Sequence, residues 1–312
     1  MRTKRYAAAI TAAFVVTALA ACGAPGSAGG GGGGGGGTTS PSAGAETGDG
    51  PYALEIEENP EFEAGTTMAT LAEAGTMTIG TKFDQPLFGL LGTGDVPEGF
   101  DVAIGALVAS KLGIPFDSIE WTETPSNIRE TAIQNGDVDI VVATYTINDK
   151  RKELIDFAGP YFVAGQAIMV LADNEDITGP EDLEGQPVCS VEGSTPAATI
   201  VDEYGAELFA TDVYSNCLDP LRNGDVVAVT TDNVILSGFV AQNEPEFKLA
   251  GDGETFTEEP YGIGLKKDDQ AFRDFINDVL EESFDDGTWA RLFEQTAGQV
   301  LPVPDPPTVD RY

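Results

Sequence analysis

The stretch "ATYTINDKR", residues 143–151, follows an apolar run and places a hydroxyl and a guanidinium near the end of an expected strand. The guanidinium of Arg151 can hold a carboxylate through two parallel hydrogen bonds, which a lysine cannot do. Thr146 can add a hydroxyl donor. An ordinary surface arginine on a helix is the alternative. The residue types and their spacing therefore predict a carboxylate-binding site.

The segment "GSTPA", residues 193–197, is a second candidate for anion binding. Pro196 suits the first position of a helix. Ser194 and Thr195 would then lie at the helix N-terminus, where free N–H groups and a partial positive charge attract anions. Thr195 can offer both its N–H and its hydroxyl. A plain capped helix without a ligand is the alternative.

Asp232 follows the apolar run "VVAVTT" and is a candidate for binding a cation. A carboxylate at the end of a buried strand needs a cationic partner or several hydrogen-bond donors. It could also serve as the N-cap of a helix over 233–242. The two roles can coexist on different oxygens.

The composition excludes several classes of function. The chain has no histidine, which rules out a Ser-His-Asp triad, a Cys-His dyad and every metal site that contains histidine. We expect no catalytic residue, no cofactor and no metal. Its net charge of −36 makes nucleic acid an unsuitable partner, because phosphate binding needs a basic surface.

The first 52 residues are expected to lie outside the fold. Residues 1–21 combine a basic start with an apolar stretch that is short for a bilayer span, as in a secretory signal peptide; a transmembrane anchor is the alternative. "LAAC", ending at Cys22, resembles the lipobox of bacterial lipoproteins, which implies that Cys22 carries lipid. Residues 22–52 are rich in Gly and Ser and predict a disordered tether. In an exported chain Cys189 and Cys217 favour a disulfide, with two free buried thiols as the alternative.

The remaining sequence alternates between strand-like and helix-like stretches. Strands are expected at 76–81, 116–123 and 138–145, with helices at 100–113 and at 126–136, the latter capped by Ser126. A similar alternation follows, then a strand at 261–267 and a long amphipathic helical region up to about residue 296. The ordered part is expected between about Leu54 and Gly298. This rhythm predicts an α/β fold of two mostly parallel, doubly wound units with a cleft between them.

Five pieces occur in the order found in a known family: "GFDVAIGALVASKLG", "QNGDVDIVVATYTINDKRKELIDFAGPYF", "DLEGQPVCSVEGSTPA", "LRNGDVVAVTTD" and "YGIGLKKDD". They resemble the bacterial extracellular solute-binding proteins for polar amino acids that serve ABC importers. "GTKFDQP", "CSVEGSTPA" and "YGIGLKKDDQ" resemble in particular the glutamate-binding lipoproteins of Gram-positive bacteria, whose cysteines match Cys189 and Cys217.

The resemblance implies a two-lobed, type II periplasmic-binding-protein-like fold, with crossovers near 159–165 and 258–261. We expect the first lobe to comprise residues 53–163 and 258–300, the second lobe 164–257, and a tail 301–312.

The resemblance also implies roles for the candidate residues. Arg151 and Thr146 would bind the α-carboxylate of an amino acid, with Ser194 and Thr195 facing the same group from the other lobe. Asp232 and the carbonyl of Thr144 would bind the α-ammonium. The side-chain end would be read by Lys82, Ser126 and Arg129, with Phe83, Phe88, Tyr145 and Tyr161 as candidate walls; surface charges and plain core aromatics are the alternatives.

Counting charges at these positions favours L-glutamate. Three cations and one carboxylate leave an excess of positive charge, which glutamate offsets and glutamine does not, and an uncompensated buried charge costs several kcal/mol. Together with this preference, the resemblance implies a monomeric extracellular lipoprotein that is anchored in the cell membrane, binds glutamate or a related acidic amino acid, and delivers it to ABC permease and ATPase subunits. A sensor lipoprotein that signals to a membrane receptor is the first alternative, and a cleft enzyme such as a dehydratase is the second.

Overall fold

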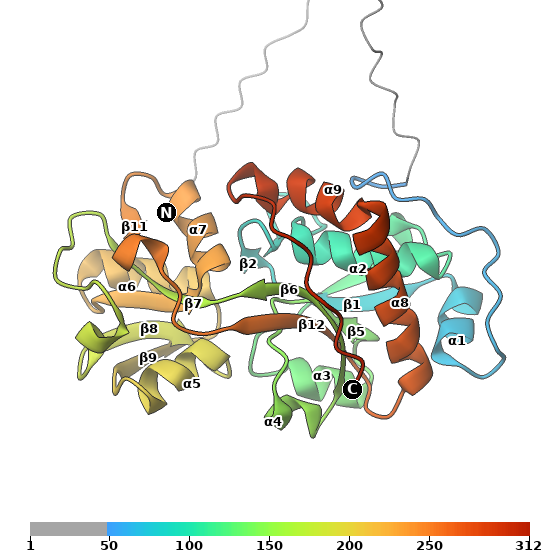
Figure 1. Ribbon diagram of the computed structural model, residues 1–312, viewed down its shortest axis with the longest axis horizontal. Helices are drawn as coiled ribbons and strands as arrows, with labels where there is room; N and C mark the ends of the chain where they lie inside the picture. Colours follow the sequence, from blue (N-terminus) through green and yellow to red (C-terminus); the bar gives the residue numbers. More distant parts are fainter. Residues whose placement is uncertain (1–48) are drawn as a thin grey trace, which may run out of the picture. The chain divides into compact units, whose positions relative to one another are not determined.

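Two five-stranded sheets carry the part of the chain that the computed structural model describes, residues 49–312. The signal segment, Cys22 and nearly all of the expected tether lie outside the described residues. Each sheet has helices packed against it and forms the centre of one lobe (Figure 1). The fold is therefore α/β with two lobes, as the sequence predicts.

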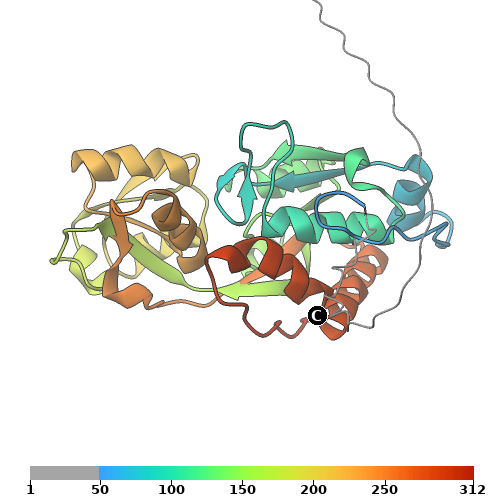
Figure 2. The ribbon, with the colours of Figure 1, turned by 90° about the horizontal axis from the view of Figure 1, so that it is seen from above.

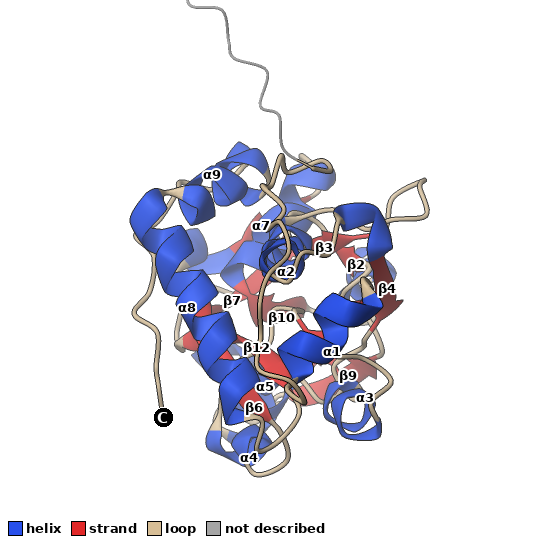
Figure 3. Ribbon diagram, turned by 90° about the vertical axis from the view of Figure 1, so that its right-hand side faces the viewer, coloured by secondary structure: helices blue, strands red, loops and turns tan. Residues whose placement is uncertain are grey.

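The first lobe is built on a mixed sheet of order β4-β1-β5-β12-β6. Strands β1 (Met77–Thr81), β4 (Ile119–Glu123) and β5 (Ile140–Val141) are parallel, whereas β12 (Glu259–Leu265) runs antiparallel to both β5 and β6 (Asp156–Ala164). The helices of this lobe are α1 (Thr67–Ala74), α2 (Phe100–Lys111), α3 (Arg129–Asn135), α4 (Asp149–Lys152), α8 (Gln270–Asp286) and α9 (Thr288–Gln295). Helices α8 and α9 follow each other along one side of the lobe (Figure 3).

The second lobe has the sheet order β11-β7-β10-β8-β9. Strands β8 (Pro187–Val191), β9 (Glu207–Thr211) and β10 (Ala228–Asp232) are parallel, and β7 (Gln166–Leu171) runs antiparallel to both β10 and β11 (Phe247–Leu249). Its helices are α5 (Thr195–Asp202), α6 (Leu218–Asn223) and α7 (Asn233–Gln242). Both sheets are thus mixed rather than mostly parallel, because each contains the strands that pass between the lobes.

Short elements complete the described chain. Strands β2 (Asp84–Gln85) and β3 (Gly89–Leu90) form a small antiparallel pair. The 3₁₀ turns are η1 (Phe116–Ser118), η2 (Pro180–Leu183), η3 (Tyr214–Cys217), η4 (Ala250–Gly253) and η5 (Ala297–Gln299). Among residues 49–312, no helix is both long and apolar enough to span a bilayer.

The chain crosses between the lobes at two adjacent segments. Strand β6 ends at Ala164 and β7 begins at Gln166, so Gly165 alone separates a strand of one lobe from a strand of the other. The return path leads through residues 254–258 into β12, which pairs with β6 (Figures 1 and 2). A Cβ atom on Gly165 would lie 2.6 Å from Cβ of Thr255 and 2.7 Å from the carbonyl oxygen of Thr257. Glycine at this position therefore lets the two crossover segments approach each other.

The expected strand over 138–145 is much shorter in the structure. Only Ile140 and Val141 pair as β5, because the chain turns away after them. Thr144 adopts a left-handed backbone conformation with φ 46°, and its N–H donates to Oδ2 of Asp101 at 2.8 Å. The buried carboxylate thus fixes the loop that carries Thr144, Tyr145 and Thr146.

Other boundaries differ from the sequence prediction for local reasons. Helix α3 begins at Arg129, so Ser126 is not its N-cap. The first residues of 116–123 form a 3₁₀ turn before β4. The long helical region is divided by Gly287, whose φ of 82° ends α8 and starts α9.

Both ends of the described chain extend the fold beyond the expected limits. Tyr52 is buried, and its hydroxyl donates to the carbonyl of Gly99 at 3.2 Å, although residue 52 was assigned to the disordered tether. The tail 301–312 contacts β6, where the N–H of Asp310 donates to the carbonyl of Gly159 at 2.8 Å. The disulfide prediction is confirmed, since Cys189 of β8 and Cys217 of η3 are bonded.

Candidate functional site

Most of the candidate residues line a cavity between the two lobes, whereas Lys82, Tyr145 and Arg151 lie next to lining residues without lining it themselves. About 220 Å³ of space lies between the lining residues, and part of it is continuous with solvent. Its lining includes Gln85, Ser126, Arg129 and Thr146 from the first lobe and Thr195 and Asp232 from the second. Segments that are far apart in the sequence thus bring cationic, anionic and hydroxyl groups to one place, which is what a zwitterionic ligand requires.

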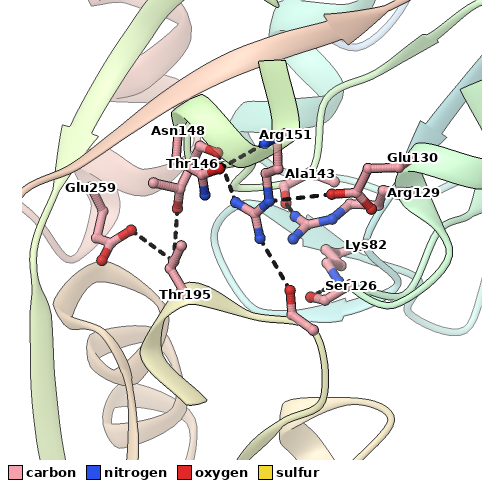
Figure 4. Close-up of polar contacts among 11 residues, drawn as sticks. Lys82, Ser126, Arg129, Glu130, Ala143, Thr146, Asn148, Arg151, Thr195 and Glu259 are labelled. Atoms are coloured by element: carbon pink, nitrogen blue, oxygen red, sulfur yellow. Dashed lines mark hydrogen bonds and ion pairs between the residues drawn. The ribbon is translucent and has the colours of Figure 1, made fainter. Parts of the chain in front are cut away.

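Arg151 is buried at one end of this site and is not a surface arginine (Figure 4). Its Nη1 donates to the carbonyl of Thr146 at 2.7 Å, and its Nη2 donates across the lobes to the carbonyl of Gly193 at 3.1 Å. Its Nε lies 3.3 Å from Oε1 of Glu130. Burial and, second, the positive charge of Arg129 lower the pKa of Arg151 to about 10, so it remains charged at neutral pH. The guanidinium is therefore held rigidly by three acceptors.

The helix end at 194–197 lies beside this group from the other lobe. Ser194 is the N-cap of α5, and its hydroxyl accepts from the N–H of Ala197 at 3.1 Å. Thr195 occupies the first helical position and Pro196 the second, one place later than the sequence suggested. The hydroxyls of Thr146 and Thr195 lie 3.1 Å apart and link the lobes. The free N–H groups of this helix end lie where they can assist in binding an anion.

Asp232 is buried at the boundary of β10 and α7, and only one of its oxygens has a partner. Its Oδ2 accepts from the hydroxyl of Tyr261 at 2.5 Å, whereas Oδ1 has no hydrogen-bond partner among the described residues. Its side chain makes no capping hydrogen bond to α7, so the helix-cap alternative does not account for it. Burial and, second, the negative charge of Glu259 raise the pKa of Asp232 to about 7. A ligand ammonium would supply both a donor and the missing positive charge.

Lys82 is buried and donates from Nζ to the hydroxyl of Ser126 at 2.9 Å. Burial and, second, repulsion from Arg129 lower the pKa of Lys82 well below its ordinary value. Within residues 49–312, no carboxylate oxygen lies within 4.0 Å of Nζ, since Lys82 takes part in no ion pair. An anion beside Lys82 would raise this pKa again, because it stabilises the charged form.

Arg129, at the start of α3, is also buried without an acidic partner among the described residues. Its Nη1 donates to the carbonyl of Ala143 at 3.0 Å, and its guanidinium lies over the ring of Tyr145 at 4.0 Å from the centroid. Its Nε has no hydrogen-bond partner in the described chain. Lys82 and Arg129 therefore place two basic groups on the side of the site away from Glu259, where Arg129 lines the cavity and Lys82 lies behind Ser126, to which it donates (Figure 4).

The aromatic candidates separate into site and core. Tyr145 contacts Arg129, and its ring lies 5.0 Å from the guanidinium carbon of Arg151, so it lies between the two ends of the site. Tyr161 and Phe88 are fully buried in the aromatic core of the first lobe, where the hydroxyl of Tyr161 donates to Asp101 at 2.6 Å. Phe83 is half-buried and does not line the cavity.

Several residues near the site escaped the sequence analysis, among them Gln85, Glu130, Tyr214, Ile235, Glu259 and Tyr261. Gln85 lines the cavity and accepts from the hydroxyl of Thr144 at 2.9 Å. Glu130 and Tyr261 hold Arg151 and Asp232, and Glu259 accepts from Thr195. Gln85 and Glu130 lie next to predicted site residues in the sequence, and this proximity could have identified them. Glu259 and Tyr261 are distant in the sequence, and only the crossover segment places them beside the site.

A profile of the bacterial extracellular solute-binding proteins, family 3, matches residues 77–299. The chain belongs to this family. It is 44% identical over 248 residues to the glutamate-binding protein GluB of Corynebacterium glutamicum, covering 77% of this chain and 84% of that protein. It is 31% identical over 296 residues to the ABC transporter glutamine-binding protein GlnH of Bacillus subtilis, covering 94% and 96%.

Solved structures agree with the fold. An ancestral arginine-binding protein bound to arginine superposes with a TM-score of 0.66 at 35% identity, covering 71% of this chain and 98% of that one. The ancestral amino acid-binding protein AncCDT-1, a precursor of cyclohexadienyl dehydratase, gives 0.67 at 27% identity, covering 74% and 99%. The fold is thus the two-lobed, type II solute-binding fold. The family is one of binding proteins, although its fold also occurs in the ancestry of an enzyme.

Proposed function

We propose that this protein binds L-glutamate between its two lobes and passes it to an ABC importer. The observation that carries the proposal is the pair of buried cations, Lys82 and Arg129, without an acidic partner in the described chain. They lie beside a site that has separate places for a carboxylate, at Arg151, and for an ammonium, at Asp232. A second carboxylate on the ligand would compensate this charge, which a neutral side chain cannot do.

The ligand atoms are assigned as follows in this proposal. The α-carboxylate bonds to Arg151 and to the helix end at Ser194 and Thr195, with Thr146 beside it. The α-ammonium bonds to Oδ1 of Asp232 and to the carbonyl of Thr144. The side-chain carboxylate bonds to the cations at the other end of the cavity, Lys82 and Arg129, with Ser126 as an additional hydroxyl and Tyr145 as a wall.

The relatives support an amino acid as the ligand but differ in which one. The GluB and GlnH proteins are named for glutamate and glutamine respectively. The test is a calorimetric titration of the purified protein with glutamate, glutamine, aspartate and asparagine. We expect micromolar or tighter binding of glutamate, equivalent to about −8 kcal/mol, with weaker binding of the other three. Stronger binding of glutamine would contradict the side-chain assignment and leave the α-amino-acid assignment intact.

The same samples test the alternative of an enzyme. We propose that the protein does no chemistry on its ligand, so glutamate recovered after long incubation should be unchanged. Chromatographic detection of a stoichiometric excess of any product over protein would contradict this.

We further propose that the protein is a monomer anchored to the outer face of the cell membrane through lipid on Cys22. The "LAAC" motif supports the anchor, and two acyl chains suffice for stable anchoring. Cys22→Ser should move the protein from the membrane fraction to the medium, with glutamate affinity unchanged. Retention of this variant in the membrane would contradict the lipid anchor. Import and sensing differ in the partner, so cross-linking should recover permease and ATPase subunits rather than a lone receptor.

A further inference from the structure

Glu259 is a buried carboxylate at the crossover between the lobes, where β12 begins. Its Oε2 accepts from the hydroxyl of Thr195 at 2.8 Å, and its Oε1 accepts from the hydroxyl of Thr257 at 3.1 Å. Within residues 49–312, no Lys or Arg nitrogen lies within 4.0 Å of it. Glu259 therefore places a negative charge, without a direct cationic partner, next to Thr195, which is proposed to help bind the ligand's α-carboxylate.

Because Glu259 is a hydrogen-bond acceptor, it determines which hydroxyl donates in each neighbouring hydrogen bond. An ionised carboxylate can only accept, so the hydroxyl of Thr195 uses its single hydrogen on Glu259. The contact of 3.1 Å between Thr146 and Thr195 must then have Thr146 as its donor. A relay therefore runs from Thr146 of the first lobe through Thr195 of the second lobe to Glu259 (Figure 4). Both hydroxyl hydrogens are therefore committed to this relay and are not free to donate to a ligand.

The charge of Glu259 acts on both α-groups of the proposed ligand. It attracts Arg151, as the influence of Glu259 on the pKa of that guanidinium indicates, and so competes with a ligand carboxylate. It also lies near Asp232, because Tyr261, whose hydroxyl donates to Asp232, follows two residues later on the same face of β12. From there it repels Asp232 and contributes, after burial, to the raised pKa of that carboxyl. The other charged or titratable groups that influence Asp232 include Tyr261, whose hydroxyl donates to it, Tyr214, which lines the same cavity, and the cations Arg129 and Arg151.

We propose that Glu259 is a positioning residue that weakens the hold on the amino acid and sets the pH at which it is released. It does so by drawing the Thr195 hydroxyl away from the α-carboxylate, and by opposing with its own charge both that carboxylate and the ionised form of Asp232. A binding protein that must hand its ligand on benefits from such a limit on affinity. The inference rests on the proposed binding of an α-amino acid and adds that Glu259 limits the affinity of this binding.

The test compares the wild-type protein with Glu259→Gln and with Glu258→Gln by calorimetric titration between pH 5.5 and 8.5. Glutamine at position 259 keeps the size of the side chain and one acceptor oxygen but removes the charge. We expect Glu259→Gln to bind the amino acid about tenfold more tightly at pH 7 and to lose affinity at a lower pH than the wild type. Glu258 is exposed and adjacent, so Glu258→Gln makes the same change in net charge and should match the wild type.

Weaker or unchanged binding of the amino acid by Glu259→Gln would overturn the inference. If Glu259 merely supported Thr195, its substitution would lower the affinity of the protein for the amino acid. An equal gain in Glu258→Gln would also overturn it, since the effect would then be that of net charge. If Glu259→Gln fails to fold, Glu259→Asp provides the second measurement. It keeps the charge and should keep the wild-type pH midpoint, and a midpoint shifted to lower pH would contradict the inference.

Failure of the proposed function is visible separately in the wild type. If the wild type binds no amino acid at any pH, the proposed function is wrong, and this inference with it. If it binds glutamine in preference to glutamate, only the side-chain assignment is wrong. The comparison of variants then proceeds with glutamine, because the two amino acids share the α-groups that Glu259 opposes.

Discussion

The protein compensates positive charge differently at the two ends of the candidate site. Arg151 lies beside Glu130 and donates to two backbone carbonyls. The protein itself therefore fixes the position of this guanidinium and compensates much of its charge. Lys82 and Arg129 donate to a hydroxyl and to one carbonyl, and within residues 49–312 neither has a carboxylate within 4.0 Å. The first arrangement is pre-organised to orient a group, whereas the second leaves charge to be compensated.

This difference suggests a division of labour. A rigid, compensated arginine suits the α-carboxylate that all amino acids share, because its geometry does not depend on which ligand enters. Uncompensated buried cations suit discrimination, because a ligand that does not supply the anion leaves them unpaired at a cost of several kcal/mol. The first end should therefore control whether an amino acid binds, and the second end which one.

The largest expected effect is that of Arg151→Ala. Removing the guanidinium leaves the α-carboxylate without its main partner and also leaves Glu130 unpaired, so we expect a loss of roughly 3–5 kcal/mol for every amino acid. Titration with glutamate and glutamine measures it, and both should be lost together. Lys150→Ala is the matched control, since Lys150 is the exposed neighbour in the same helix. A loss confined to one of the two ligands would break the proposed division.

A smaller and selective effect is expected from Lys82→Met and from Arg129→Met. Each substitution keeps much of the side chain's length and removes the charge, so we expect glutamate to bind about a hundredfold more weakly and glutamine to change less than about fivefold. The measured quantity is the ratio of the two dissociation constants. Lys111→Met controls for net charge, because Lys111 is in a surface ion pair with Glu282. Parallel losses of both ligands would show that this end does not discriminate.

The pH dependence of ligand binding should distinguish Asp232 from Lys82, because the two groups weaken binding at opposite ends of the pH range. Asp232 has a pKa raised to about 7 and must be ionised to pair with an ammonium, so affinity falls as pH drops below about 7. Lys82 has a lowered pKa and must be protonated to pair with a carboxylate, so glutamate affinity also falls as the solution becomes alkaline. Each limb can approach about a tenfold change per pH unit for a single proton.

Dissociation constants measured between pH 5.5 and 9.5 test both limbs. Lys82→Met should lose the alkaline limb for glutamate and keep the acid limb. Glutamine should show the acid limb in the wild type and only a weak alkaline one, because its amide has no charge to pair with Lys82. An affinity for glutamate that does not change below pH 7 would contradict the role given to Asp232.

The sequence was sufficient for the alternation of elements and for most of the residues that meet at the cavity. Periodicity predicts α2, and the stop at Gly136 ends α3 as expected. Asp232 stands out because a buried charge at the end of an apolar run is costly without a partner, and Arg151 because a guanidinium beside hydroxyls can hold a carboxylate through two hydrogen bonds. These are local signals, carried by residues within one strand, one helix and the turn that follows.

The remainder depends on contacts between distant segments. Ser126 is predicted both as a helix cap and as a site residue beside Lys82 and Arg129; it is not the cap, and its hydroxyl accepts from Lys82, 44 residues earlier in the chain. Glu259 looked like one of many acidic residues, and only the crossover brings it to Thr195. The mixed sheets are a second example. The antiparallel strand β12 belongs to the first sheet, although it lies more than 100 residues after the parallel strands β1, β4 and β5 in the sequence. Neither spacing nor composition encodes such meetings.

The smallest effect on binding is expected from removal of the disulfide, although its effect on stability is large. Cys189 and Cys217 are separated by 28 residues, and closing a loop of that length contributes roughly 3–4 kcal/mol on the chain-entropy model. Both cysteines are fully buried within the second lobe and do not line the cavity, whereas both discriminating cations belong to the first. The variant with Cys189→Ala and Cys217→Ala should therefore unfold at lower denaturant concentration but keep the wild-type ratio of glutamate to glutamine affinity. Titration of the folded variant at low temperature gives that ratio. A ratio that falls toward one would mean that the second lobe also selects the side chain, and that the division between the two ends is not as sharp as the charges suggest.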